Sequence, residues 1–203
     1  MNYEQMPDEQ TLLSTKANLE AHGFGVIITA NKEEALAKLK ELIPQGAEVM
    51  TGSSTTLIEL GFIKHLESPD HSWKSLHKEI GSASDDSKRS DLRRRHSAAE
   101  YFLGSVNAIS QTGELVACDA SGSRVSAYPF AAKHLILVSG TQKIVPNLEL
   151  AMKRVREYVF PLEDARALKA YGMHSTLGKW VILEREFVPK RITLVLVKEK
   201  LGF

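Results

Sequence analysis

Short apolar runs that alternate with well-capped helical segments constrain the fold of this chain more than any other feature. Residues 24–30 form one such run, rich in Val and Ile, and residues 47–50 form another. Between these two runs, Asn31 is placed to cap a helix and Pro44 to stop it. A strand, a helix and a second strand at this spacing predict a right-handed crossover and a parallel sheet. The chain is therefore predicted to be an α/β protein with a mainly parallel sheet flanked by helices.

The rest of the chain supplies more elements of both kinds. Helices are predicted to begin after three capping residues, Asp8, Asp85 and Asn147. The helix after Asn147 is predicted to end at Pro161, because proline lacks the N–H that a helix interior needs. Strands are predicted at three more apolar runs, residues 135–139, 180–185 and 192–198. Two β-prone runs, 106–110 and 115–118, flank a Gln-Thr-Gly turn, so they are predicted to form a hairpin.

Length and composition narrow the class of protein. The 203 residues are predicted to fold as one domain, residues 1–203, with an irregular excursion or lid around 68–84. The 26 Lys and Arg residues nearly balance the 25 Asp and Glu residues, so the charge does not favour nucleic acid or a membrane surface as a partner. No apolar run approaches the about 20 residues that span a bilayer. The polar start lacks the pattern of a signal peptide, so a cytoplasmic location is predicted.

The loop after the second strand is the first candidate ligand site. It consists of small and hydroxyl residues that lead into an apolar helix, namely Gly52, Ser53, Ser54, Thr55 and Thr56. Backbone N–H groups and hydroxyls at such a place are suited to a phosphate or a carboxylate. The loop is not a P-loop, because no lysine follows the glycine at the required spacing. The alternative interpretation is that a Ser or Thr here only caps the helix.

A second strand end carries an acid, small residues and a cation. Residues 115–118 run into Asp119, and Arg124 follows five positions later. Four small residues between them let a ligand approach the main chain, namely Ala120, Ser121, Gly122 and Ser123. Asp119 and Glu114 are the candidates for acid–base catalysis, since a nearby arginine favours an ionised Asp119. The alternative is that Asp119 only accepts hydrogen bonds from the N–H groups of the following turn.

These two loops are predicted to meet in one cleft, because the carboxyl ends of parallel strands gather at one edge of a sheet. Lys143, which follows the strand at 135–139, is predicted either to reach an anion in this cleft or to be simply exposed. One arginine of residues 93–95 is a further candidate, but the sequence does not select which. Cys118 is interpreted as a small buried residue. Three histidines, at 65, 71 and 77, lack a completing ligand pattern, so no metal and no cofactor are predicted.

Several short motifs together resemble the LUD-domain family of lactate-utilisation proteins. In order, they are residues 52–56, 92–95, 101–110, 112–116, 119–125, 138–145 and 201–203. Each motif is short, but their order and spacing cover most of the chain. The resemblance implies a sheet of the kind shared by ribose-phosphate isomerases, glucosamine-phosphate deaminases and CoA transferases. The loop at 51–55 also looks like the phosphate loop of the isomerases.

The chain departs from part of that family at two points. Larger members bind iron–sulfur clusters through many cysteines, whereas Cys118 is the only cysteine here. Position 123 is Ser where many relatives carry Asn. The resemblance therefore implies a small, cluster-free member that binds a small anionic metabolite and supports oxidation of lactate to pyruvate, alone or beside iron–sulfur subunits. Two alternative functions stay open. One is a free-standing enzyme for a sugar phosphate or an acyl-CoA, and the other is a non-enzymatic assembly or regulatory protein. Homo-oligomerisation also stays open.

Overall fold

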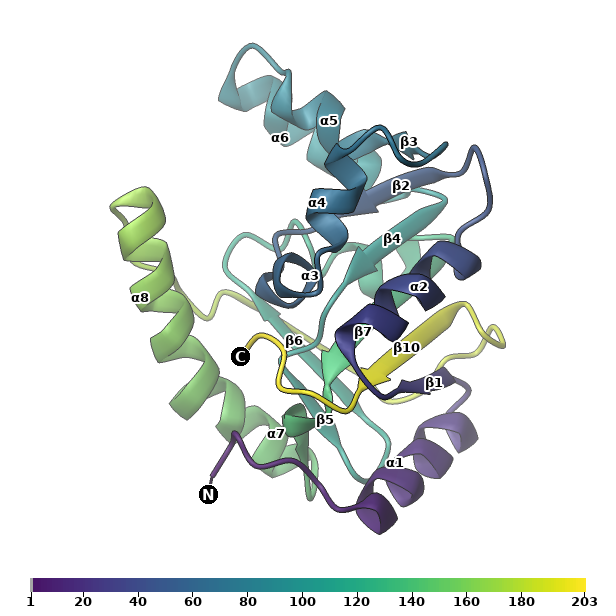
Figure 1. The fold of residues 1–203 in the computed structure, drawn as a ribbon. Coiled ribbons are helices and arrows are strands. Elements are labelled where there is room, and N and C mark those ends of the chain that lie inside the picture. The colour runs from purple at the N-terminus through teal and green to yellow at the C-terminus, as the bar shows by residue number, and fades with distance from the viewer. Residues whose placement is uncertain (1) are drawn as a thin grey trace.

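The computed structural model describes residues 2–203 and is built on a six-stranded parallel sheet (Figure 1). In spatial order its strands are β1 (Gly25–Thr29), β10 (Ile192–Val197), β7 (His134–Gly140), β4 (Tyr101–Gly104), β2 (Glu48–Thr51) and β3 (Lys74–Ser75). The register aligns Val26 with Leu194, and Leu194 with Leu137. The predicted parallel sheet is therefore confirmed, although three strands separate β1 from β2.

Helices cover both faces of this sheet, which explains why β10 is apolar along nearly its whole length. Leu194 and Leu196 pack in one core cluster with Leu19 of α1 (Glu9–Ala21). Val195 and Val197 point the other way, into a cluster covered by three helices. Those helices are α2 (Lys32–Leu42), α3 (Thr55–Glu59) and α4 (Phe62–Glu67).

A second, four-stranded sheet packs beside the first. Its order is β8 (Ile144–Val145), β5 (Ala108–Ser110), β6 (Leu115–Asp119) and β9 (Lys179–Leu183). The antiparallel β5–β6 pair is the predicted hairpin, and Gly113 in its turn has a φ of 110°, a value that favours glycine. The two C-terminal strands belong to different sheets, because β9 pairs with β6 in the second sheet whereas β10 lies inside the first sheet.

The predicted helix caps are present. The side chains of Asp8, Asn31, Asp85 and Asn147 each accept a hydrogen bond from the backbone N–H three residues further on. They begin α1, α2, α6 (Asp86–His96) and α7 (Leu148–Arg154). Short 3₁₀ or π turns are η1 (Ala127–Ala131), η2 (Thr141–Lys143) and η3 (Val155–Val159).

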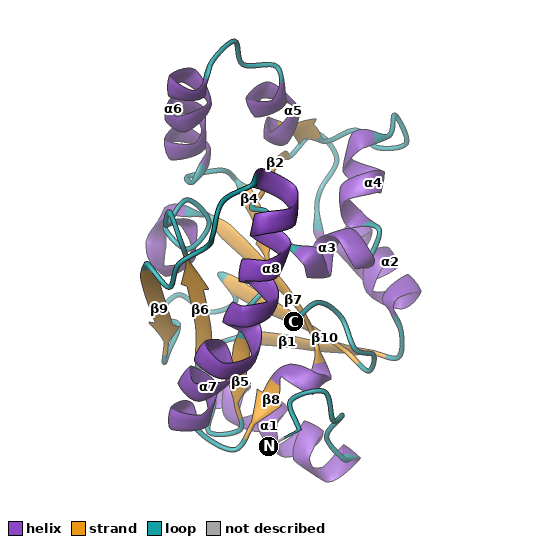
Figure 2. Ribbon diagram, turned by 90° about the vertical axis from the view of Figure 1, so that its left-hand side faces the viewer, coloured by secondary structure: helices purple, strands orange, loops and turns teal. Residues whose placement is uncertain are grey.

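The prediction that Pro161 ends its helix is wrong. The π turn η3 follows α7 directly, and α8 (Phe160–Tyr171) continues from it with Pro161 near its start. Within η3 the hydrogen bonds span five residues, as in the bond from the Phe160 N–H to the Val155 carbonyl. A proline at the start of a helical segment lacks only an N–H that would be unpaired there, so the wider turn accommodates it. The resulting long helical arm lies along one side of the molecule (Figure 2).

The stretch predicted as an irregular excursion, residues 68–84, contains β3 and α5 (Leu76–Gly81). Trp73 anchors it to the rest of the molecule. Its indole N–H donates to the Ile43 carbonyl at 3.2 Å, and its ring stacks on Phe62 with 5.9 Å between centroids.

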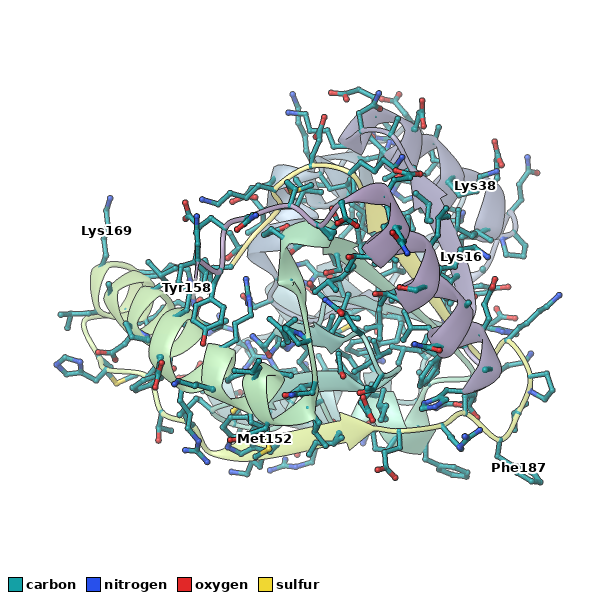
Figure 3. All side chains as sticks on the ribbon, turned by 90° about the horizontal axis from the view of Figure 1, so that it is seen from below. Lys16, Lys38, Met152, Tyr158, Lys169 and Phe187 are labelled. Carbon is teal, nitrogen blue, oxygen red and sulfur yellow. The ribbon has the colours of Figure 1, made fainter. Side chains whose placement is uncertain are left out.

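Charged and apolar side chains also project from the surface. Figure 3 shows Lys169 pointing outward from α8 and Phe187, which is 97% exposed, at the far end of the molecule. In residues 2–203 no helix is long and apolar enough to cross a membrane.

Candidate functional site

A cavity of about 750 Å³ lies where β2 and β6 end. Both predicted loops line it, the first with residues 52–56 and the second with Asp119, Ser121, Ser123 and Arg124. The loops touch, since a Cβ on Gly52 would lie 2.5 Å from Cγ of Arg124. They meet because the second sheet packs against the first, and not because β2 and β6 belong to the same sheet.

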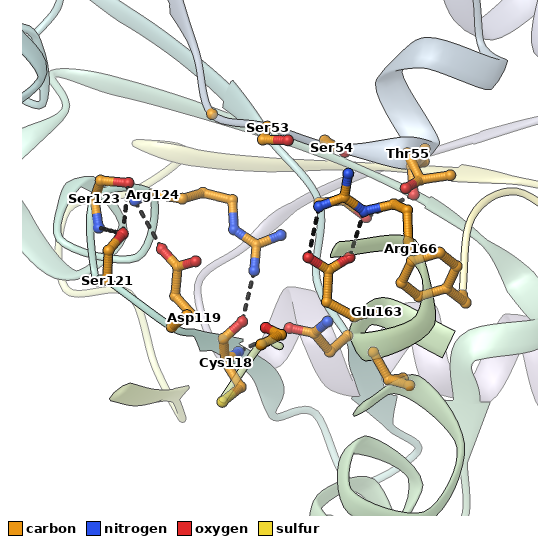
Figure 4. A pocket seen from close by; sticks show the side chains of 18 of the residues that line it. Ser53, Ser54, Thr55, Cys118, Asp119, Ser121, Ser123, Arg124, Glu163 and Arg166 are labelled. Carbon is orange, nitrogen blue, oxygen red and sulfur yellow. Dashed lines mark hydrogen bonds and ion pairs between the residues drawn. The ribbon is translucent and has the colours of Figure 1, made fainter. Parts of the chain in front are cut away.

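The hydroxyl residues of the first loop have different roles. Ser54 caps α3, because its Oγ accepts a hydrogen bond from the Leu57 N–H at 3.3 Å. The Oγ1 of Thr56 accepts hydrogen bonds from Lys143 and from Ser105. Ser53 and Thr55 line the cavity with hydroxyls that make no hydrogen bond to another group of residues 2–203 (Figure 4). The capping interpretation therefore holds for Ser54 alone.

Among the described cations that line the cavity, Arg124 is the one with a buried nitrogen that lacks a hydrogen-bond partner. One guanidinium nitrogen, Nη2, donates to the Cys118 carbonyl at 2.6 Å. Its Nε is buried without a hydrogen-bond partner within residues 2–203. Arg124 also forms no ion pair with any described residue. An arginine in this state is suited to an incoming anion, because buried donors without partners raise the free energy of the protein.

Asp119 organises the turn that carries Arg124. Its Oδ2 accepts hydrogen bonds from the N–H groups of Arg124 at 2.9 Å and Val125 at 3.4 Å. These hydrogen bonds are the ones that the alternative interpretation of Asp119 predicts. The Asp119 side chain also lines the cavity.

Two other predicted residues lie outside the cavity lining. Glu114 precedes β6, five residues of extended chain from Asp119 or about 16 Å away. There it accepts a hydrogen bond from the Thr112 hydroxyl, so it is not placed to act with Asp119. Gly122 has a φ of 89° and lies against the side chain of Lys179, where it shapes the turn without facing the cavity.

Lys143 is buried at the edge of the cavity, so the alternative that it is simply exposed is wrong. Its Nζ donates to the Thr56 hydroxyl at 3.0 Å, and to the Ser105 hydroxyl and the Val106 carbonyl at 3.2 Å each. Burial, reinforced by the charges of Arg154 and Arg124, holds the pKa of Lys143 well below its ordinary value of 10.5.

Arg154 is, like Lys143, a buried cation, but it does not line the cavity, and its Nε and Nη2 are buried without a partner within residues 2–203. Its Nη1 donates to the Asn107 carbonyl, and the ring of Tyr158 lies 5.0 Å from its guanidinium carbon. Burial lowers the pKa of Arg154 to about 10. The positive charges of Arg154 and Arg124 both contribute to the lowered pKa of Lys143.

Helix α8 supplies a wall that the sequence analysis did not anticipate. Glu163 and Arg166 form a two-point ion pair, with both N–O distances 2.7 Å, and Figure 4 shows this pair across the cavity from Arg124. The hydrogen bonds that Arg166 donates to Glu163 raise the pKa of Arg166. The helical spacing of residues could have predicted this wall only if the helix had been predicted to continue past Pro161.

Of the arginine cluster at residues 93–95, Arg93 lines the cavity. Arg94 is paired with Asp91 on the surface at 2.8 Å. Apolar side chains complete the lining, among them Ile58, Ile63, Val155, Val159, Phe160 and Met173.

Cys118 is buried, and burial raises the pKa of its thiol, so the interpretation as a small buried residue agrees with the structure. The part of the chain that the structure describes holds no group of three or more His, Cys, Asp or Glu side chains that could bind a metal. His71 stacks on Trp73, whereas His77 lines the cavity with its Nδ1 3.5 Å from the Thr51 hydroxyl.

Fold and cavity together define an α/β protein with a mainly parallel sheet and a polar cavity at strand ends. Residues 12–197 match the LUD domain. The chain belongs to the LUD-domain family, which confirms the resemblance seen in its motifs and supports a role related to lactate utilisation in general.

A solved structure with a similar fold is that of a DUF162 family protein from Deinococcus radiodurans. The two chains share 12% identity and a TM-score of 0.59, and the match covers 95% of this chain and 99% of the other. At this identity the likeness concerns the fold alone. No curated protein matches the sequence.

Proposed function

We propose that this chain binds a small anionic metabolite, a carboxylate or a phosphate, in the cavity between residues 52–56 and the turn after Asp119. The observation that carries the proposal is the state of Arg124, which lines the cavity with a buried Nε lacking a partner in residues 2–203. A bound anion would give the guanidinium the partner that it lacks. The hydroxyls of Ser53 and Thr55, which line the same cavity, add neutral donors.

We further propose that this binding serves the oxidation of lactate to pyruvate. Family membership supports the general role, and lactate and pyruvate each carry the carboxylate that the cavity is suited to hold. With Cys118 as its only cysteine, the chain has no all-cysteine ligand set for a cluster. Electron transfer would then depend on iron–sulfur subunits that work beside this protein.

A thermal-shift screen of the purified protein tests the ligand class. Lactate, pyruvate, sugar phosphates and CoA esters would each be added, with the unfolding temperature as the readout. A ligand that binds only the native state at 100 times its Kd adds about 2.7 kcal/mol to the free energy of unfolding. Deleting the gene and measuring growth on lactate tests the role, and unchanged growth with unchanged lactate oxidation would contradict it.

The size of the cavity favours a second candidate, a free-standing enzyme for a sugar phosphate or an acyl-CoA. A volume of about 750 Å³ exceeds the needs of a three-carbon acid and lies in the range of about 300–1,000 Å³ typical of larger ligands. Arg93, which also lines the cavity, would supply more positive charge for such a ligand. This candidate predicts turnover by the purified protein without partners, which separates it from the first.

A further inference from the structure

The amino group of Lys143 is enclosed by three groups that form hydrogen bonds with it. The Nζ contacts two hydroxyls, those of Thr56 and Ser105, and one carbonyl, that of Val106. A charged ammonium donates to all three. A neutral amine can donate to two of them and accept from a hydroxyl, so the same contacts satisfy both forms.

The charges around Lys143 favour the neutral form. Arg154 and Arg124 are the nearby cations, and Glu59 is the nearby carboxylate. Glu59 is engaged elsewhere, since its Oε2 accepts a hydrogen bond from the Gly202 N–H at 2.6 Å. Within residues 2–203 no carboxylate forms an ion pair with Lys143. Desolvation and neighbouring cations are the two conditions that activate a lysine as a nucleophile.

We propose that Lys143 is a nucleophile that forms an imine with the carbonyl group of an anionic substrate held at Arg124. This proposal rests on the proposed function, because the anion site positions the carbonyl compound. The substrate class is a carbonyl compound that carries an acidic group, either a 2-oxo acid or a keto-sugar phosphate.

The chemistry balances without another reactant. The lone pair of Nζ forms a bond to the carbonyl carbon, and one Nζ proton passes to the carbonyl oxygen to give a carbinolamine. The oxygen then takes up the second Nζ proton and leaves as water, and the carbon–nitrogen double bond remains. The hydroxyls of Thr56 and Ser105, which also contact each other at 3.1 Å, are placed to move the proton from nitrogen to the departing oxygen.

An imine of this kind changes what the site can do. When protonated, the imine withdraws electrons from the adjacent carbon. It stabilises negative charge on that carbon better than the free carbonyl does. The cavity would then hold its substrate covalently while Arg124 keeps the acidic group in place.

Reductive trapping tests the proposal. The protein is incubated with pyruvate or with dihydroxyacetone phosphate, treated with borohydride, and its mass is measured. One adduct per chain is expected with at least one of the two compounds, and peptide mapping should place it on Lys143. The compound that reacts distinguishes a 2-oxo acid from a keto-sugar phosphate. Mapping the wild-type adduct gives the answer even if a variant at this position fails to fold.

Two variants sharpen the result. Lys143→Met keeps the apolar stem and should lose the adduct completely. Lys133→Met removes an exposed lysine whose side chain is 68% accessible, and it should keep the adduct. An adduct spread over surface lysines, or none on Lys143, would overturn the proposal.

Calorimetry with the same two compounds separates this proposal from the proposed function. Binding without an adduct on Lys143 would refute the imine and leave the anion site intact. Absence of binding, together with absence of an adduct, would refute both.

Discussion

Replacing Arg124 by alanine should weaken anion binding at least tenfold. In the structure one Nη2 hydrogen is donated to the Cys118 carbonyl, and Nε and Nη1 have no hydrogen-bond partner within residues 2–203. A hydrogen bond from a charged donor contributes about 1.5–3 kcal/mol, so the loss of one such bond corresponds to about 10- to 150-fold in Kd. Two lost bonds would raise the effect further.

Titration calorimetry with pyruvate and with inorganic phosphate provides the assay. Arg124→Lys should restore affinity only in part, because an ammonium lacks the two-point geometry of a guanidinium. Arg94→Ala is the matched control, since Arg94 lies on the surface, paired with Asp91, and its loss should leave Kd unchanged. The unfolding temperature of each variant shows that the fold survives. Full affinity in a folded Arg124→Ala variant would refute the assignment of Arg124 as the anion-binding residue.

Three further predictions address the surrounding structure. Gly52→Ala places a Cβ 2.5 Å from Cγ of Arg124, so calorimetry should show weaker anion binding with the positive charge still present, and an unchanged Kd would contradict this. Tyr128→Phe removes the hydroxyl that bonds both the N–H and the carbonyl of buried Ser105, so urea unfolding should show a loss of about 1–3 kcal/mol; a loss below about 0.5 kcal/mol would argue against it. The hydrogen bond from the Thr11 N–H lowers the pKa of Asp8 below its ordinary value of 3.8, so Asp8 stabilises the fold above that pH and loses this effect as the pH falls through its folded pKa. Asp8→Asn keeps the cap without the titration, so its unfolding temperature should fall less than that of the wild type between about pH 5 and pH 3, and equal falls would count against the cap.

Local physical chemistry determined much of this fold from the sequence alone. The caps at Asp8, Asn31, Asp85 and Asn147 were predictable, because a cap depends on a side chain and a backbone group three residues away. Most strands were predictable from apolar runs, although β3, β4 and β8 were not predicted, and the hairpin was predictable from its short turn. The α/β class follows from the alternation of these elements.

Only the tertiary structure decided what surrounds the cavity. Lys143 follows a strand much as an exposed lysine would, and it is buried because Thr56, Ser105 and Val106 reach it from distant parts of the chain. Glu163 and Arg166 face Arg124 because a π turn carries the helix past Pro161. The second sheet brings β6 to the end of β2 through pairings that no local pattern specifies. Contacts of this kind depend on how whole elements pack, whereas caps and turns depend on neighbours in the chain.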